Sequence, residues 1–334
     1  MRIVITECDH DSFDDEFAAA EAAGAELIVA QSRTREELIA NAQGADALVV
    51  QYARIDGDVL DALPTVRAIG RYGVGVDTID IAAATERGVV VCNVPDYGTE
   101  AVSDHAIALV LAAAREIPRL DRAMREGRVD FPGIRPVRLI GDRVFGVLGM
   151  GRIGQATARK ARGLGYEVIY HDVFGASADI DQAFRSVSLD ELLERSAVVS
   201  VHAPLTDETH HLIGRAELAR MRPDAIIVNT SRGGVIDTDA LVEALQAGTI
   251  RSAALDVTEV EPMPVGHPLF DLPQVTLTPH MAWYSEESYG ELKRRTVENP
   301  ARIVAGGEPT NVVNPEVLGS KQYLDRAAAG RLTP

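Results

Sequence analysis

The chain has 334 residues, and its 33 lysines and arginines against 50 aspartates and glutamates give a formal net charge of −17. This length fits about two domains of ordinary size. The acidic surplus disfavours nucleic acid and anionic membrane surfaces as partners, because both are bound through clustered lysine and arginine. The two cysteines, Cys8 and Cys92, are too few for a disulfide framework and are expected to pack as small apolar residues. The sequence shows no Cys/His cluster with metal-ligand spacing, so no metal is expected.

The longest strongly apolar run, residues 106–114, is far shorter than the roughly 20 residues that span a bilayer. The N-terminus shows neither a long apolar region nor a small-residue cleavage site. We therefore expect a cytoplasmic protein without a transmembrane segment.

Short β-branched runs alternate along the chain with Ala- and Leu-rich stretches of helical spacing. The runs predict strands at 3–5, 27–29, 47–51, 68–71, 89–92, 144–148, 167–170, 198–201, 225–228, 253–256 and 275–277. The stretches between them predict helices at 35–42, 98–115, 155–162, 189–193, 239–247 and 286–304. Alternation of this kind is typical of an α/β protein with parallel sheets.

The predicted strands, about eleven in number, are many for one open sheet. The long helical segment 98–115 interrupts the alternation, and a second long helix at 286–304 follows the last strand. We therefore predict a discontinuous first domain, 1–97 plus 285–334, around an inserted domain at 98–284. The tail after Val317 is polar and Ala-rich and is expected to fray or pack loosely.

A strand at 144–148 runs into the motif Gly149-Met150-Gly151-Arg152-Ile153-Gly154 and then into a helix. Glycines in this order allow a tight turn, close approach of backbone N–H groups to a pyrophosphate, and close helix packing. Asp172 ends the next strand, where a dinucleotide site binds the adenosine ribose and where a carboxylate repels the extra phosphate of NADP. The pattern favours NAD over NADP, although the glycines alone would also suit a plain strand-to-helix turn.

Three further segments, 228–237, 254–262 and 278–283, each follow a predicted strand. Parallel strands place their carboxyl ends at one edge of the sheet, where ligands bind. The segments supply Arg232, a carboxylate and His280. A cation for a carboxylate and an acid–base group active near neutral pH are what an oxidoreductase of hydroxy and keto acids needs.

At these residues the chain resembles the D-isomer-specific 2-hydroxyacid dehydrogenase family. The resemblance also covers 71–80, 91–95 and the glycine motif, and residues 210–213 and 280–286 look closest to the C-terminal binding protein branch. It implies two Rossmann-like or flavodoxin-like domains, the inserted one binding NAD and the first one substrate, with the active site in the cleft between them. It also implies reversible hydride transfer between a D-2-hydroxy acid and NAD.

The resemblance assigns roles residue by residue. His280 is the implied acid–base group, Glu261 its partner, and Arg232 the ligand of the substrate carboxylate and C2 oxygen. Implied substrate contacts are Arg71, the N–H groups of Val74 and Gly75, and Trp283. Implied cofactor contacts are Gly149, Gly151, Arg152, Ile153, Gly154, Asp172, Ala203, Pro204, Thr209, Thr230 and Asp256, of which Asp256 accepts from the carboxamide. We expect Glu259 to be solvated and His105 to be a surface or packing residue.

The family further implies a homodimer, formed through the helix at 98–115 and the segment 131–139. Two alternatives stay open. One is an NAD-sensing scaffold of the corepressor type, in which turnover is incidental; the other is a phosphoglycerate dehydrogenase.

Overall fold

The structure is a computed structural model that describes residues 1–129, 133–141, 143–175 and 180–331. The chain divides into two compact units, which we call unit 1 (Met1–Tyr97 and Ser285–Pro334) and unit 2 (Gly98–Tyr284). Each contains one parallel sheet, as the sequence predicts. Residues 131 and 132 of the predicted dimer segment lie outside the described residues.

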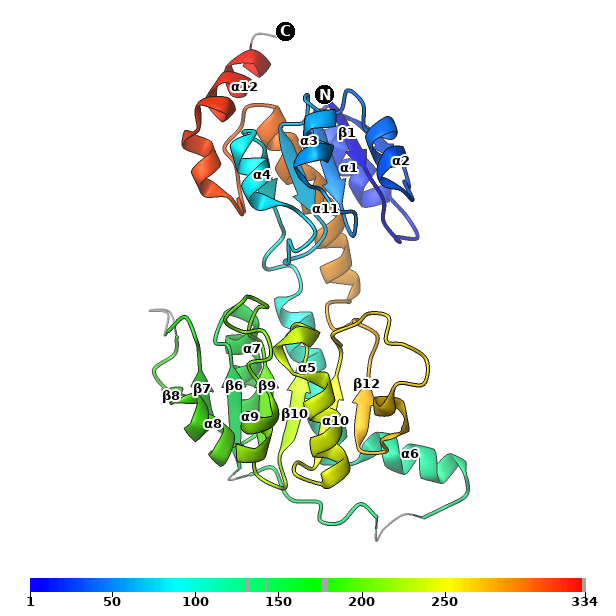
Figure 1. Cartoon of the computed structure of the whole chain (residues 1–334), viewed down its shortest axis with the longest axis vertical. Coiled ribbons are helices and arrows are strands. Elements are labelled where there is room, and N and C mark those ends of the chain that lie inside the picture. Colours follow the sequence, from blue (N-terminus) through cyan, green and yellow to red (C-terminus); the bar gives the residue numbers. More distant parts are fainter. Residues whose placement is uncertain (130–132, 142, 176–179, 332–334) are drawn as a thin grey trace. The chain divides into compact units, whose positions relative to one another are not determined.

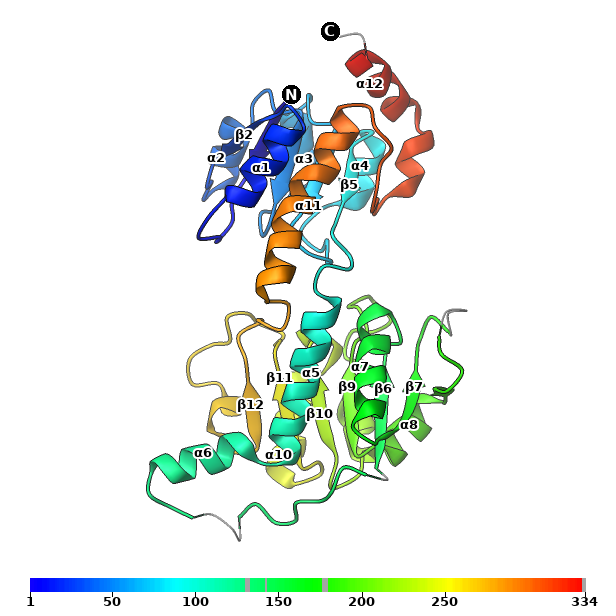
Figure 2. The same cartoon turned by 180° about the vertical axis from the view of Figure 1, so that it is seen from behind.

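Unit 1 has a five-stranded sheet in the order β2-β1-β3-β4-β5. Its strands are β1 (Arg2–Ile5), β2 (Glu26–Val29), β3 (Ala47–Val50), β4 (Ala68–Arg71) and β5 (Val90–Cys92). Its helices are α1 (Asp14–Ala22), α2 (Arg35–Asn41), α3 (Gly57–Ala62), α4 (Ile81–Glu86), α11 (Glu286–Val304) and α12 (Lys321–Arg331), with a 3₁₀ turn at Pro315–Gly319. Helices α1 and α11 cover one face, and α2, α3 and α4 cover the other (Figures 1 and 2). Because both faces are covered, β3 is buried throughout, in keeping with its continuous apolar run.

Unit 2 has a seven-stranded sheet in the order β12-β11-β10-β9-β6-β7-β8. Its strands are β6 (Val144–Leu148), β7 (Glu167–His171), β8 (Arg185–Ser186), β9 (Val198–Val201), β10 (Ile226–Asn229), β11 (Ser252–Leu255) and β12 (Val275–Leu277). Its helices are α5 (Thr99–Ala114), α6 (Ile117–Arg125), α7 (Arg152–Gly163), α8 (Leu189–Arg195), α9 (Arg215–Arg220) and α10 (Thr238–Ala247), with 3₁₀ turns at Gly233–Val235 and Pro268–Asp271. Helices α5 and α7 pack on one face, and α8, α9 and α10 pack on the other (Figures 1 and 2).

The predicted strands are all present, but the sequence missed β8. This strand has two exposed residues at the edge of the sheet, too few and too polar to give a pattern. The tail forms helix α12, and its side chains at 321–325 are exposed or half-buried. Just before that tail, Asn314 is fully buried; its Oδ1 accepts from the Val91 N–H at 2.9 Å, which ties the C-terminal segment to β5.

Both cysteines are buried, in agreement with the prediction. Burial raises the pKa of the Cys92 thiol to about 12, so it behaves as a small apolar side chain. Within the described ranges, every helix is too short or too polar to span a lipid bilayer.

Candidate active site

Two side chains predicted to act as an acid–base pair meet at the carboxyl end of the sheet in unit 2. His280 Nδ1 lies 2.7 Å from Glu261 Oε2, and Glu261 Oε1 accepts from the Thr258 N–H at 3.0 Å. His280 has a positive φ of 55°, and its N–H donates to the Asp256 carbonyl at 2.8 Å, which fixes the turn after β12. Because Nδ1 faces the carboxylate, Nε2 is the ring nitrogen left for a substrate.

The surroundings of the His280–Glu261 pair keep the Glu261 carboxylate ionised. Burial alone would raise the pKa of Glu261, but the hydrogen bonds from His280 and Thr258 outweigh it, and the pKa lies below its usual value. The Arg232 charge acts in the same direction. Glu261 is therefore an ionised acceptor that orients the ring and favours a proton on Nδ1.

The pair lines an open pocket of about 450 Å³. Its wall consists of Asp256, Thr258, Glu261, Pro262, Met263, Phe270, Leu277, Thr278, Pro279 and His280. Acid–base groups thus stand beside apolar side chains, as a site for a small organic ligand requires.

Arg232 follows β10 and lies against the loop that carries Glu261. Gly233 makes this possible, because a Cβ at that position would overlap the backbone of Thr258. The Asn229 side chain donates to the Arg232 carbonyl at 3.0 Å, and Arg232 Nη1 donates to the Ser231 carbonyl at 2.9 Å. The structure thus places Arg232, Glu261 and His280 on neighbouring turns.

The glycine motif between β6 and α7 has the geometry of a dinucleotide site. Gly149 has a φ of +93°, and a Cβ there would lie 2.6 Å from the Ala203 nitrogen. Gly151 has no atom within 4 Å of such a Cβ, which leaves its surroundings open to a ligand. Arg152 and Ile153 begin α7, whose N-cap Gly151 offers no side-chain cap, so the helix N-terminus is available to a phosphate. A Cβ on Gly154 would overlap the Gly149 carbonyl, which explains the third glycine.

Asp172 lies at the rim of a second pocket, of about 350 Å³, next to this motif. Gly149, Met150, Gly151, Asp172, Val173, Phe174, Gly175, His202, Ala203 and Pro204 line it. Asp172 Oδ2 accepts from the Met150 N–H at 2.6 Å and Oδ1 from the Phe174 N–H at 2.9 Å. The residues present therefore fit a bound dinucleotide.

Residues 107–282 match the family described as D-isomer specific 2-hydroxyacid dehydrogenase, NAD binding domain. Glyoxylate reductase of Korarchaeum cryptofilum is 41% identical over 291 residues, which cover 85% of this chain and 87% of the relative. The chain belongs to the D-isomer specific 2-hydroxyacid dehydrogenase family. D-3-phosphoglycerate dehydrogenase of Archaeoglobus fulgidus is 40% identical over 87% of this chain but only 55% of its own length.

Among solved structures, a glyoxylate reductase from Paecilomyes thermophila superposes with a TM-score of 0.84 at 32% identity, covering 94% of this chain and 98% of the other. The protein is thus an NAD-dependent oxidoreductase of the 2-hydroxyacid dehydrogenase type. These relatives do not bear on the C-terminal binding protein branch, which stays a prediction.

Thr209 and Thr230, both predicted to contact the cofactor, differ in the hydrogen bonds that their hydroxyl groups make. Thr209 is fully buried, and its hydroxyl donates to the Pro204 carbonyl at 2.6 Å and accepts from the Thr206 N–H at 2.8 Å. Its side chain thus shapes the loop after β9. The buried hydroxyl of Thr230 has no hydrogen-bond partner among the described residues, so it is available to a ligand.

Asp256 also holds the turn that contains His280. Its Oδ1 accepts from the Thr278 hydroxyl at 2.5 Å and the Met281 N–H at 3.0 Å, and its Oδ2 accepts from the Ala282 N–H at 2.9 Å. His105 Nε2 lies 3.0 Å from the Thr278 hydroxyl. Sequence reasoning missed this support from His105, because the two partners are 173 positions apart and neither belongs to a local motif.

Glu259 is exposed, as expected, but two contacts also hold its carboxylate in place. Its Oε1 lies 2.6 Å from His211 Nε2, and its Oε2 accepts from the Thr238 N–H at 2.9 Å. Burial alone would raise the pKa of Glu259, but the hydrogen bonds with His211 and Thr238 outweigh this effect. The pKa of Glu259 therefore lies below its usual value, and the carboxylate stays charged. Ligand atoms of His210, His211 and Glu259 lie within 4.8 Å of one another, a grouping that the sequence spacing did not show. The contacts of Glu259 brace the loop in which Glu261 stands.

In unit 1, the loop after β4 presents two free donors. Asn93 Nδ2 donates to the Val74 carbonyl at 2.7 Å, and the Val94 N–H donates to the Gly73 carbonyl at 3.1 Å. In the described part of the chain, the N–H groups of Val74 and Gly75 have no acceptor. Arg71 Nη1 donates to the neighbouring Tyr72 carbonyl, which folds its guanidinium over the start of this loop. Trp283, in unit 2, is half-buried and stands edge-on to Tyr284.

Proposed function

We propose that this dehydrogenase reduces a small 2-keto acid with NADH, and that glyoxylate is among its substrates. The observation that carries the proposal is the His280–Glu261 pair, 2.7 Å apart at the wall of a pocket of about 450 Å³. The glyoxylate reductases among the relatives support the choice of substrate.

His280 is the proposed general acid in reduction and the general base in oxidation. Bound NADH supplies the hydride that reaches C2 of the keto acid. His280 Nε2 gives its proton to the C2 oxygen, and Glu261 stabilises the imidazolium before that transfer. Arg232 binds the carboxylate and polarises the C2 carbonyl.

Arg71 and the N–H groups of Val74 and Gly75 are proposed to bind the substrate carboxylate, since those N–H groups are donors without acceptors. Trp283 is the proposed apolar wall for the substrate side chain. For the cofactor, the glycine motif with Arg152 and Ile153 binds the pyrophosphate, Ala203 and Pro204 border the adenosine, and Thr230 and Asp256 meet the nicotinamide.

NADH is the proposed cofactor in preference to NADPH. Asp172 places a carboxylate at the adenosine pocket, and the residues that follow, Val173 and Phe174, bring no cation that could meet a 2′-phosphate.

We also propose a homodimer. The predicted interface helix, α5, packs on α7 and the sheet, and its apolar face is buried in unit 2. Four apolar side chains on α6 and after it are exposed: Ile117 is 54% exposed, Met124 72%, Val129 88% and Leu139 84%. We propose that the interface includes these side chains of α6 and Leu139 of the predicted segment 131–139, because contiguous exposed apolar surface marks interaction sites. A cytoplasmic location stays a prediction.

A panel of 2-keto acids tests the proposal: glyoxylate, hydroxypyruvate, pyruvate and phosphohydroxypyruvate, each with NADH and with NADPH, followed by nicotinamide absorbance. Preference for phosphohydroxypyruvate would favour a phosphoglycerate dehydrogenase. Tight NADH binding without turnover of any acid would refute the enzyme and favour an NAD-sensing scaffold. His280→Ala is expected to remove turnover and keep NADH binding, whereas His210→Ala, at an exposed histidine, is the matched control.

A further inference from the structure

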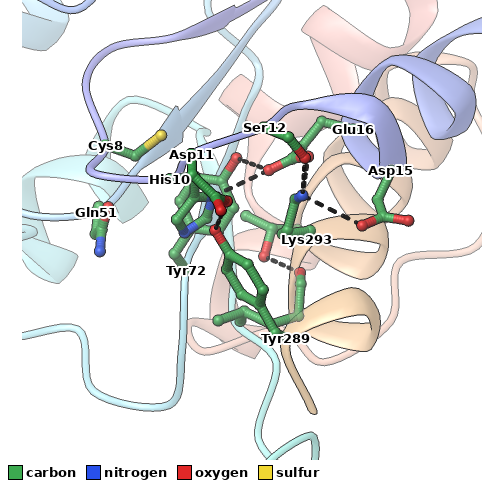
Figure 3. A network of polar contacts seen from close by, with 12 residues as sticks. Cys8, His10, Asp11, Ser12, Asp15, Glu16, Gln51, Tyr72, Tyr289 and Lys293 are labelled. Atoms are coloured by element: carbon green, nitrogen blue, oxygen red, sulfur yellow. Dashed lines mark hydrogen bonds and ion pairs between the residues drawn. The ribbon is translucent and has the colours of Figure 1, made fainter. Parts of the chain in front are cut away.

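Unit 1 contains a cluster of buried polar side chains that the proposed chemistry does not use. We call His10, Glu16, Tyr72, Tyr289 and Lys293 the Glu16 cluster (Figure 3). Glu16 is 0% exposed, and the side chains of His10 and Lys293 are each 3% exposed. An ionised group buried this deeply destabilises a fold unless other groups compensate its charge.

Glu16 is the centre of the cluster. Its Oε1 accepts from the Tyr72 hydroxyl at 2.9 Å and lies 3.1 Å from His10 Nδ1. Its Oε2 lies 3.6 Å from Lys293 Nζ. The carboxylate is thus held by a hydroxyl from the residue that follows β4, a ring from the loop after β1, and a cation from α11.

Lys293 and Tyr289 fix the far side of this carboxylate. Lys293 Nζ donates to Ser12 Oγ at 3.2 Å and lies 4.9 Å from the centre of the Tyr289 ring. The Tyr289 ring stands edge-on to His10 at 5.0 Å. These contacts hold the Glu16 carboxylate in place. It is therefore a rigid acceptor for the Tyr72 hydroxyl.

Tyr72 links the cluster to the loop after β4. It follows Arg71 directly and precedes Gly73, Val74 and Gly75. Its N–H donates to the Val50 carbonyl at 2.9 Å, so both the backbone and the hydroxyl of Tyr72 are anchored. Burial and the Glu16 charge raise the pKa of Tyr72 above its ordinary value, which favours the neutral phenol as a donor.

We propose that Glu16 is a positioning residue for substrate binding: through the Tyr72 hydroxyl it fixes the direction of the Val74 and Gly75 N–H groups toward the substrate carboxylate. This rests on the proposed function, because it takes those N–H groups to be carboxylate ligands. If Glu16 and Tyr72 only filled the core, two apolar side chains could replace them. A fixed direction for the Val74 and Gly75 N–H groups instead requires a hydrogen bond that holds Tyr72 in place.

Tyr72→Phe tests the proposal in the full chain, because it removes one hydroxyl and keeps the ring. The probe is oxalate, a dicarboxylate analogue of a 2-keto acid, titrated calorimetrically into the NADH-saturated protein. We expect the oxalate Kd and the KM for glyoxylate to rise about five-fold. This is the effect of losing one ordinary hydrogen bond between the loop N–H groups and the ligand carboxylate. The NADH Kd and kcat should stay within about two-fold of wild type.

Asn314→Ala is the matched control, because it removes buried hydrogen bonds of unit 1 at β5 and leaves the Tyr72–Glu16 hydrogen bond in place. It should lower Tm at least as much as Tyr72→Phe and leave the oxalate Kd unchanged. Equal weakening of oxalate binding by both variants would show a general loss of stability and overturn the proposal. An unchanged oxalate Kd in Tyr72→Phe would overturn it as well.

A double variant tests the coupling itself. If Glu16 acts through Tyr72, Glu16→Ala with Tyr72→Phe should bind oxalate no more weakly than Glu16→Ala alone, whereas independent effects would multiply and refute the link. Turnover by the wild-type protein distinguishes failure of the positioning role of Glu16 from failure of the proposed keto-acid reduction. Reduction of glyoxylate with normal oxalate binding in Tyr72→Phe removes only the positioning role, whereas no turnover of any keto acid removes the proposed function.

Discussion

The pairing of Glu261 with His280 makes a quantitative prediction for Glu261→Gln. Glutamine has nearly the shape of glutamate and can still accept from the Thr258 N–H. Its amide NH₂ then faces His280 Nδ1, where the carboxylate oxygen lies 2.7 Å away. Two donors cannot share that position, so the ring must put its proton on Nε2 and loses the charge that stabilises its imidazolium.

The size of the effect follows from the geometry. A hydrogen bond to a charged group contributes about 1.5–3 kcal/mol. The two side chains are 46% and 38% exposed, so solvent screens the pair and we take the lower part of this range, about 2 kcal/mol. That corresponds to a fall in kcat of about 30-fold. Loss of the histidine itself should cost more, about 10²–10⁴-fold, because it removes the proton transfer.

The assay is steady-state reduction of glyoxylate by NADH, with the NADH Kd measured by fluorescence. Glu259→Gln is the control, because Glu259 lies in the same loop and bonds to His211 rather than His280. We expect Glu261→Gln to lower kcat with an unchanged NADH Kd, and Glu259→Gln to keep kcat within about two-fold. A similar fall in kcat for both variants would show that the loop, and not the His280–Glu261 pair, limits catalysis.

Three further predictions concern other parts of the chain. Asp172→Ala should narrow the preference for NADH over NADPH in kcat/KM, and an unchanged ratio would exclude Asp172 from cofactor selection. His202 is half-buried, and desolvation of its ring lowers its pKa from 6.5 to about 4. The unfolded chain therefore binds a proton that the folded chain does not, and urea unfolding should show up to about 3 kcal/mol of stability lost as pH falls from about 6.5 to about 4. His202→Asn should flatten that dependence, and an equally steep loss in the variant would assign it to another group. Met124→Asp should dissociate a dimer formed through α6 in analytical ultracentrifugation, and an unchanged mass would place the interface elsewhere.

Local signals in the sequence located most of the fold and the glycine motif. The run from Val144 to Gly154 contains a complete strand, turn and helix start, so its neighbours in the chain determine its structure. β8 escaped notice because Arg185 and Ser186 pair at a sheet edge, where nothing requires an apolar side chain. The helical tail at Lys321–Arg331 was missed because its polar face gives no clear periodicity.

Side-chain pairing was harder to foresee, and the reason is physical. Glu259 and Glu261 are both glutamates of one loop, yet one meets His211 and the other His280. Only the resemblance separated them in the sequence, since charge and spacing treat them alike. The structure distinguishes them because β11 and β12 bring the turn of His280 beside Glu261, while the loop after β9 brings His211 beside Glu259.

The buried pair of Glu16 and Lys293 extends the same reasoning. A charged residue in an amphipathic stretch is normally solvated, so Glu16 in α1 and Lys293 in α11 each suggest a surface position. Each is buried among groups that compensate its charge: Lys293 and the Tyr72 hydroxyl face Glu16, and Lys293 Nζ also lies 3.3 Å from Asp15 Oδ2. Glu16 and Lys293 belong to helices near opposite ends of the chain. Such a pair has no signature in either segment alone. This pair implies that α1, α11 and the residue after β4 are joined by one network of polar contacts. Such residues can set the direction of the Val74 and Gly75 N–H groups without contacting the ligand.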